Sequence, residues 1–284
     1  MTNSTTKIQL FLKTFEQDIR IAFAFLTRIP VSYPVDKDGK AIDRNLADAS
    51  WAFPFVGLIV GLCGALVLII SDTLLHLPIY VSALLAITTT IIITGALHED
   101  GLADVADGFG GSHDRDRKLE IMKDSTVGSY GSLALCITVL LRTVLLGSLL
   151  DWGGMDVSQE GEGFFMDLPT GIIAIMISAH IIGRGYAPLI MSHLPLARKN
   201  GLAAMANKPK LRSSYGGFLI TLIFVFSLLP FFPALIVLSS AFCVLILLSW
   251  LSLKQIGGYT GDVLGSAVLL CEIAVYLSAL GTLT

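Results

Sequence analysis

The chain has 284 residues, of which 54% are hydrophobic and only 14% are charged. Soluble domains carry roughly 25% charged residues, so this composition excludes an ordinary soluble protein. The formal net charge of −3 argues against nucleic acid as a partner. The four cysteines lie in apolar runs without metal-ligand spacing, and they predict neither a disulfide framework nor a cysteine metal site.

The first 50 residues are predicted to form a cytoplasmic arm. Apolar residues recur at helical spacing between Ile8 and Leu26, and the charged residues fall largely elsewhere around the helix. This pattern predicts an amphipathic helix lying in the membrane interface. A signal peptide is not indicated, because Arg20 and Arg28 interrupt the apolar stretch and no small-residue cleavage site follows.

Apolar runs of about 20 residues follow, long enough to cross a bilayer as helices. They predict seven spans, at about 51–70, 78–97, 130–150 and 170–190, two within 216–253, and one from about 260 to the C-terminus. Pro230 and Pro233 mark the break between the fifth and sixth spans. The sequence therefore predicts an all-α, polytopic membrane helix bundle, with residues 1–284 forming one domain.

The loops alternate in charge. Lys and Arg occur in the N-terminal arm, in 98–129, in the loop after the fourth span and at Lys254, whereas 71–77, 151–169 and 230–233 contain none. The positive-inside rule then predicts a cytoplasmic N-terminus and an outside C-terminus, in a bacterial inner membrane. The acidic, Gly-rich loop 151–169 is predicted to be solvated. Gly57, Gly61 and Gly64 line up along the first span, as small residues do where helices approach closely.

The chemistry-bearing segment begins at the end of the second span, where residues 98–111 read H-E-D-G-L-A-D-V-A-D-G-F-G-G. Asp100, Asp104 and Asp107 have the spacing i, i+4, i+7 and share one face of a helix. Their mutual repulsion near a membrane favours a bound cation, and oxygen ligands suit Mg²⁺. The alternative is an acidic surface turn. His98 is a candidate metal ligand, phosphate donor or interfacial residue.

Mixed charges follow in 117–131, which reads R-K-L-E-I-M-K-D-S-T-V-G-S-Y-G. Glu120 and Asp124 are four residues apart and are expected on a short helix, with Lys123 beside them. Carboxylates and cations at one surface suit a phosphate-bearing substrate and its metal. An ordinary surface helix with ion pairs is the alternative.

Ionisable residues also lie within the predicted spans. Arg142 is in the third span, His180 and Arg184 are in the fourth, and Glu272 is in the seventh. Such residues are functional candidates, with internal ion pairs as the alternative.

The last chemical motif, G-G-Y-T-G-D-V-L-G at 257–265, is a Gly-rich turn that opens a helix. Its free backbone N–H groups around Thr260 and Gly261 could bind a phosphate. Asp262 would either cap the helix or bind the metal.

These segments together resemble the signature segments of the cobalamin synthase family, adenosylcobinamide-GDP ribazoletransferase. The motifs at 98–111, 119–131 and 257–267 carry the resemblance, supported by F-L-T-R-I-P-V at 25–31 and P-F-V-G-L-I-V-G at 54–61. Glu99 departs from the family pattern, which we expect to have an apolar residue there. The family implies an integral membrane enzyme that joins adenosylcobinamide-GDP to α-ribazole, or its 5′-phosphate, and releases GMP with Mg²⁺ as cofactor.

Transferred onto this chain, the resemblance implies three groups of site residues. The metal ligands would be Asp100, Asp104 and Asp107; the catalytic residues Asp124, Asp262 and His98; and the substrate-binding residues Lys123, Arg142, Arg184, Thr260 and Gly261. A partial resemblance links D-x-x-D-G at 104–108 to the CDP-alcohol phosphotransferase motif, but the Ala-Arg pair expected after it is missing.

Two other classes of protein are weighed against this interpretation. A transporter would place its acids near the bilayer midplane, whereas these acids cluster at one face. A purely structural membrane subunit leaves the shared face of Asp100, Asp104 and Asp107 unexplained. The expected partners are the two substrates and the lipid bilayer; the oligomeric state is open, with a homo-oligomer among the options.

Overall fold

The computed structural model describes residues 2–35, 42, 44–155, 168–198 and 208–282, and within these residues every regular element is a helix. In chain order they are α1 (Thr2–Leu26), η1 (Asp48–Ala52), α2 (Phe53–Ile69), η2 (Ile70–Leu74), α3 (Ile79–Thr94), α4 (Leu97–Gly111), α5 (Arg115–Ile121), α6 (Ser129–Met155), α7 (Leu168–His193), α9 (Leu211–Leu228), α10 (Phe231–Ile256) and α11 (Gly261–Leu280). In this part of the chain six helical segments are long and apolar enough to cross a membrane, and α3 with α4 would make a seventh. The predicted helical membrane bundle is confirmed.

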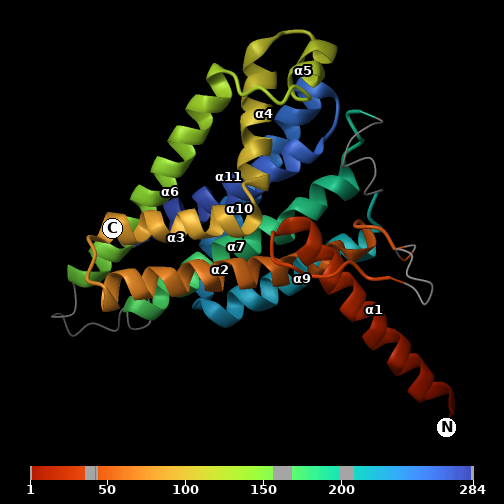
Figure 1. Cartoon of the computed structure of the whole chain (residues 1–284), viewed down its shortest axis with the longest axis horizontal. Helices are drawn as coiled ribbons and strands as arrows, with labels where there is room; N and C mark the ends of the chain where they lie inside the picture. Colours follow the sequence, from red (N-terminus) through yellow and green to blue (C-terminus); the bar gives the residue numbers. More distant parts are fainter. Residues whose placement is uncertain (1, 36–41, 43, 156–167, 199–207, 283–284) are drawn as a thin grey trace.

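Helix α7 is the centre of the bundle, packed against α2, α9 and α11 (Figure 1). The predicted glycine stripe explains how closely α2 approaches it. A Cβ atom on Gly57 would lie 2.7 Å from the Cα atom of Ile181, and one on Gly61 would lie 2.8 Å from the Cα atom of Ile177. The stripe therefore does serve helix packing, since any side chain there would push the two backbones apart.

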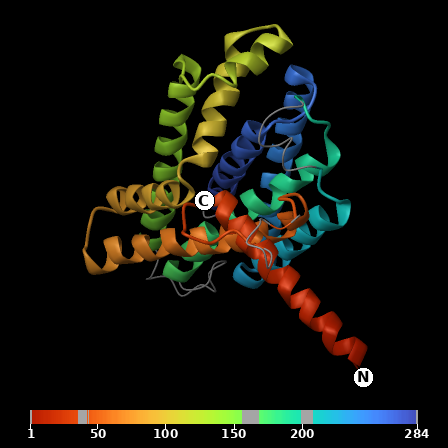
Figure 2. The ribbon, with the colours of Figure 1, turned by 45° about the vertical axis from the view of Figure 1, so that its right-hand side comes forward.

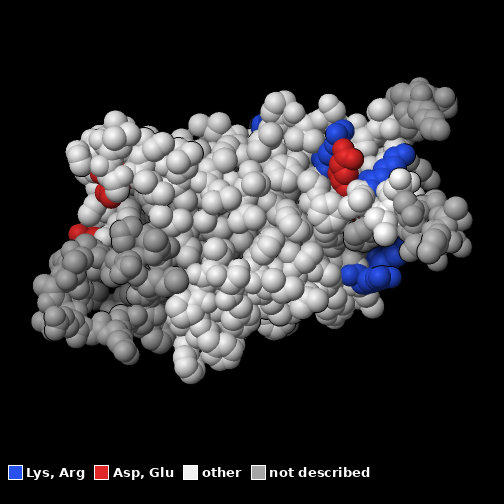
Figure 3. Space-filling view, turned by 90° about the horizontal axis from the view of Figure 1, so that it is seen from below, with Lys and Arg blue, Asp and Glu red and all other residues white. Residues whose placement is uncertain are grey.

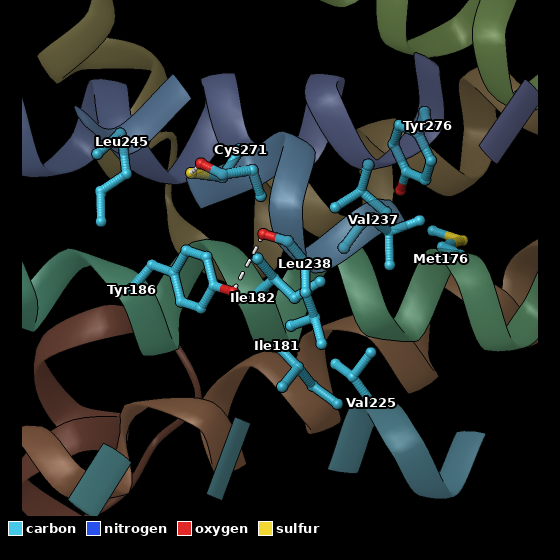
Figure 4. Close-up of a cluster of buried hydrophobic side chains, with 14 of the residues drawn as sticks. Met176, Ile181, Ile182, Tyr186, Val225, Val237, Leu238, Leu245, Cys271 and Tyr276 are labelled. Carbon is cyan, nitrogen blue, oxygen red and sulfur yellow. Dashed lines mark hydrogen bonds between the residues drawn. The ribbon is translucent and has the colours of Figure 1, made fainter. Parts of the chain in front are cut away.

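One part of the core around α7 is an apolar cluster. Figure 4 shows side chains from α7, α9, α10 and α11 meeting in one cluster. The Tyr186 hydroxyl group is buried there and donates a hydrogen bond to the backbone oxygen of Leu238 on α10 at 3.2 Å. The predicted break between α9 and α10 is confirmed, because α9 ends at Leu228 and α10 begins at Phe231, directly after Pro230.

The chain turns by 90° between α3 and α4. Gly95 and Ala96 both have left-handed backbone conformations, with φ of 64° and 57°. Ala96 adopts a conformation that costs an L-residue energy, so tertiary contacts must hold the turn. One of them is the backbone N–H of Arg28, which donates to the Ile93 oxygen at 2.7 Å. As a result α4 leaves the plane of α2 and α3 and runs beside α6 (Figures 1 and 2).

Helix α1 joins the bundle only at its C-terminal end and otherwise extends away from it (Figures 1 and 2). Ala22 and Leu26 pack against the beginning of α2. The buried Asp18 carboxylate accepts hydrogen bonds from the Trp51 indole at 2.7 Å and from Arg44 at 2.6 Å, and this bonding raises the pKa of Arg44. In the extended half the described side chains Ile8, Leu10 and Leu12 are exposed. The interfacial position of this helix stays a prediction.

Charge is unevenly distributed over the surface. Figure 3 shows a broad middle zone with almost no charged side chains, and Lys and Arg gathered toward its right-hand end. This distribution is what the positive-inside prediction requires, although the orientation itself stays a prediction. Of the predicted acidic loop at 151–169, residues 156–167 lie outside the described residues.

Candidate active site

Close packing of α4 against α11 forms the centre of the candidate site. A Cβ atom on Gly101 would lie 2.9 Å from the backbone oxygen of Asp262, and the Ser266 hydroxyl donates to the Gly101 oxygen at 3.2 Å. Because glycine lets the two backbones touch, Asp100 of α4 and Asp262 of α11 line the same cavity.

This cavity has a volume of about 130 Å³ and lies between the beginnings of α4 and α11, the second half of α7 and the end of α1. Its polar wall contains the charged or ionisable side chains His98, Asp100, Arg184, Arg198 and Asp262. Its apolar wall includes Phe25, Leu26, Leu46, Phe53, Ala187 and Met191. Gly261 also lines it, with no atom within 4 Å of the position a Cβ would take. The fold thus brings together predicted site residues from three helices.

Around Asp104 on α4, carboxylates outnumber the guanidinium groups that act on it. Asp262 accepts hydrogen bonds from the Thr260 hydroxyl at 3.0 Å and from Arg198 at 3.3 Å. The negative charges of Asp262 and Asp100 act on the half-buried Asp104, and Arg198 opposes them. Three neighbouring carboxylates facing one guanidinium form a site that favours a cation or the metal complex of a phosphate.

Thr260 caps α11 with its hydroxyl oxygen, which accepts a hydrogen bond from the Val263 N–H at 3.4 Å. Thr260 and not Asp262 is therefore the helix cap, and Asp262 lines the cavity. The first turn of α11 carries the partial positive charge of a helix N-terminus, as the Gly-rich motif predicted.

Asp107 does not join the other two aspartates of its helix. Its carboxylate accepts backbone N–H groups from Gly128 at 2.7 Å and Gly131 at 2.9 Å, at the beginning of α6. A carboxylate at a helix N-terminus is stabilising, which explains this placement. Among the described residues no three His, Cys, Asp or Glu side chains are close enough to hold a metal ion. Asp107 is engaged at the beginning of α6 in this structure, and the metal site of Asp100, Asp104 and Asp107 stays a prediction.

Lys123 and Asp124 also lie apart from the cavity. The expected helix through Asp124 is wrong, because α5 ends at Ile121 and both residues lie in the turn that follows. Both side chains are exposed, and neither lines the cavity. The backbone N–H of Thr126 donates to the Asp124 carboxylate at 3.0 Å and lowers its pKa. Asp124 lines a separate, open cavity of about 350 Å³ together with Asp107, Arg117 and Glu120.

Arg142 is part of a buried ionic network and not of the cavity wall. Its guanidinium group donates to Glu99 at 2.9 Å and to Glu272 at 2.8 Å, and it is 1% exposed. The predicted contact of Arg142 with substrate phosphate stays a prediction, because in this arrangement both carboxylates already engage its guanidinium group and it does not line the cavity. The buried position follows from packing, since Arg142 of α6 and Glu272 of α11 face each other inside the bundle.

The same network reaches the cavity through α7. Glu272 contacts Arg184 at 2.9 Å and His180 at 2.6 Å. Arg184 also lines the cavity, so its predicted role at the site is compatible with its ion pair. His98, 3% exposed, lies beside it, and its Nε2 atom has no hydrogen-bond partner among the described residues.

Two contributors escaped the sequence interpretation. Arg198 lies in the basic loop after the fourth predicted span, and nothing in its spacing indicates a bond to Asp262. In the sequence Glu99 stands out only as a departure from the family pattern. An ion pair of Glu99 could have been predicted from the sequence, because Arg142 and Glu272 lie in other spans and buried charges of opposite sign are expected to pair.

Comparisons with known proteins show the family of the chain. A family profile described as cobalamin-5-phosphate synthase matches residues 18–280. The adenosylcobinamide-GDP ribazoletransferase of Bradyrhizobium diazoefficiens is 42% identical over 265 residues, which cover 92% of each chain. That of Mesorhizobium japonicum is 39% identical over 92% of each chain. That of Shewanella amazonensis is 36% identical over 94% of this chain and 96% of the relative.

No solved structure matches the chain. The relatives are named as enzymes, which favours the transferase over the transporter and the structural subunit. Since the profile and the relatives cover almost the whole chain, this protein is an enzyme of the cobalamin-5-phosphate synthase family.

Proposed function

We propose that the enzyme joins α-ribazole, or its 5′-phosphate, to adenosylcobinamide-GDP, releasing GMP and forming adenosylcobalamin or its phosphate. The names of the relatives support both substrates. The observation that carries the proposal is the cavity in which Asp100, Asp262, Arg184 and Arg198 meet beside the first turn of α11.

The reaction is a phosphoryl transfer in which one P–O bond forms and another breaks. A ribazole hydroxyl attacks the phosphorus that bears the cobinamide arm, and the bond from that phosphorus to the GMP oxygen breaks. GMP leaves with the bonding electron pair. The hydroxyl proton passes to a carboxylate, for which Asp262 is suited because Thr260 and Arg198 hold it at the cavity.

Arg184, Arg198 and the N–H groups of the first turn of α11 bind the oxygens of the pyrophosphate in this proposal. Reactions of this kind depend on positioning and on neutralising charge more than on covalent chemistry. Arg184 is pre-oriented by Glu272, so little side-chain entropy is lost when it binds an anion.

Mg²⁺ is the cofactor we propose, and the donor chemistry fits it. Mg²⁺ sites usually combine one or two carboxylates with substrate phosphates and water. Asp100 and Asp104 on α4 would supply the carboxylates, and Asp107 would not. When bound, the ion neutralises charge on the pyrophosphate and the departing GMP. The excess of carboxylates over guanidinium groups around Asp104 supports this assignment.

The enzyme would work at the cytoplasmic end of a bundle in the bacterial inner membrane. The predicted orientation puts the Lys- and Arg-rich loops, including Arg198, on that side. The cavity lies next to Arg198 and would then open toward the compartment that supplies nucleotides.

The test is release of GMP by the purified protein in detergent, supplied with adenosylcobinamide-GDP, α-ribazole and Mg²⁺. Turnover by the unaltered protein, its loss on chelation and a loss of at least about 100-fold in Asp100→Asn and Asp262→Asn would support the proposal. Asp116→Asn is the matched control, because that side chain is 82% exposed and outside the cavity. A folded protein that releases no GMP would refute the transferase assignment.

A further inference from the structure

The apolar wall of the cavity takes no part in the chemistry proposed above. Leu26, Leu46, Phe53 and Leu97 belong to one packed apolar cluster where α1, α2 and α4 meet. Side chains of α7 extend this wall toward Arg184. An apolar surface enclosed beside a charged site is typical of a pocket that buries an apolar part of a substrate and orients it with a few polar groups.

We infer that this apolar wall binds the base of the ribazole, a fused benzimidazole ring carrying methyl groups; the inference rests on the proposed function. A guanine base has hydrogen-bond donors and acceptors around its edge, and burying them without partners is costly. The side chains of Leu46, Phe53 and Met191 offer no such partners.

The placement also suits the reaction. A base held against Leu26 and Phe53 directs the attached ribose toward the polar wall, because both walls enclose the same cavity. The attacking hydroxyl then lies near Asp100 and Asp262, where the pyrophosphate is bound. The aromatic rings of Phe53 and Phe25 are available to pack on the flat base.

The variant Ala187→Leu tests this inference by filling the cavity from its apolar wall. Ala187 is 5% exposed on α7 and carries no polar group. One methylene group more or less in an apolar pocket changes discrimination by about 10–200-fold, and leucine adds three carbon atoms to alanine. KM for α-ribazole should therefore rise at least about 10-fold, while KM for adenosylcobinamide-GDP changes by less than about 2-fold. An α-ribazole analogue with an unmethylated benzimidazole should lose less than α-ribazole itself.

Ala134→Leu provides the matched control, because Ala134 is half-buried on α6 and does not line the cavity. Leu46→Phe, which narrows the same wall from a different segment, replaces Ala187→Leu if that variant does not fold. Equilibrium binding of α-ribazole alone to the unaltered and altered proteins separates this inference from the proposed function. Unaltered protein that binds α-ribazole but releases no GMP would refute only the function.

Two results would overturn the inference. A rise in KM for adenosylcobinamide-GDP with no change for α-ribazole would assign the wall to the nucleotide or the corrinoid. Equal losses for α-ribazole and its unmethylated analogue would show that the altered side chain does not meet the methyl-bearing ring.

Discussion

Replacing Glu272 by glutamine should destabilise the bundle more than any exposed substitution. The Glu272 carboxylate is fully buried and contacts His180 at 2.6 Å, Arg142 at 2.8 Å and Arg184 at 2.9 Å. The variant removes the only carboxylate that the structure shows paired with Arg184 among the described residues. Breaking a buried ion pair by removing one partner costs about 3–5 kcal/mol, because the remaining charge stays buried.

The expected result is a lower Tm in detergent. At roughly 2–4 °C per kcal/mol for a large domain, a cost of about 3–5 kcal/mol lowers Tm by roughly 6–20 °C. Glu120→Gln is the control, since Glu120 and Arg117 are 2.9 Å apart and both 65% exposed, and such surface pairs contribute about 0–1 kcal/mol. A Tm for Glu272→Gln equal to that of Glu120→Gln would refute the reasoning.

A double variant of Arg142 and Glu99 tests whether charge accounts for the stability lost when a residue of this buried network is replaced. Arg142→Met alone leaves Glu99 buried without its cation. Arg142→Met combined with Glu99→Gln removes one charge of each sign and should recover part of the lost stability. Recovery in the double variant would show coupling between the two residues. Strictly additive losses would mean that packing, and not charge, is what the single variants remove.

Three further outcomes are expected. Gly57→Ala should cost about 1–3 kcal/mol of stability by overpacking the α2–α7 contact, measured as Tm, whereas Gly216→Ala, whose Cβ would have its nearest neighbour at 3.6 Å, should leave Tm unchanged. Asp107→Ala should cost about 0.5–2 kcal/mol of stability, because the backbone N–H groups at the beginning of α6 lose their acceptor. The Mg²⁺ concentration for half-maximal GMP release should shift less in this variant than in Asp100→Asn. An equal shift in the two variants would indicate that Asp107 is a metal ligand. Asp18→Ala removes the carboxylate that holds Arg44, so trypsin should cleave after Arg44 faster in this variant. Asp48→Ala is the control, because the Asp48 carboxylate is 3.9 Å from Lys210 and has no hydrogen bond to Arg44 among those the structure shows.

The local pattern of the chain was enough to predict its helices. A span needs only a length of apolar residues. Proline cannot continue a helix beyond its first turn without disrupting a backbone hydrogen bond, so the break at Pro230 could be located, although α7 continues through Pro188. The glycine stripe of α2 predicted a close helix contact but not its partner. The expected helix through Asp124 failed because a short helix has few bonds to extend it, and the following turn is held by Asp124 itself.

Some features of the candidate site follow from the sequence alone, and others depend on the tertiary structure. The sequence by itself determined that acidic residues lie on one helix beside glycines, that buried charges of both signs occur in separate spans, and that a Gly-rich turn opens α11. Only the tertiary structure decided that Asp100 meets Asp262, that Asp107 turns to α6, and that Arg142 is enclosed by Glu99 and Glu272. Helical spacing tells which side chains share a face, but pairing depends on which faces pack together. That depends on the 90° turn at Gly95 and Ala96, which is held by contacts distant in sequence.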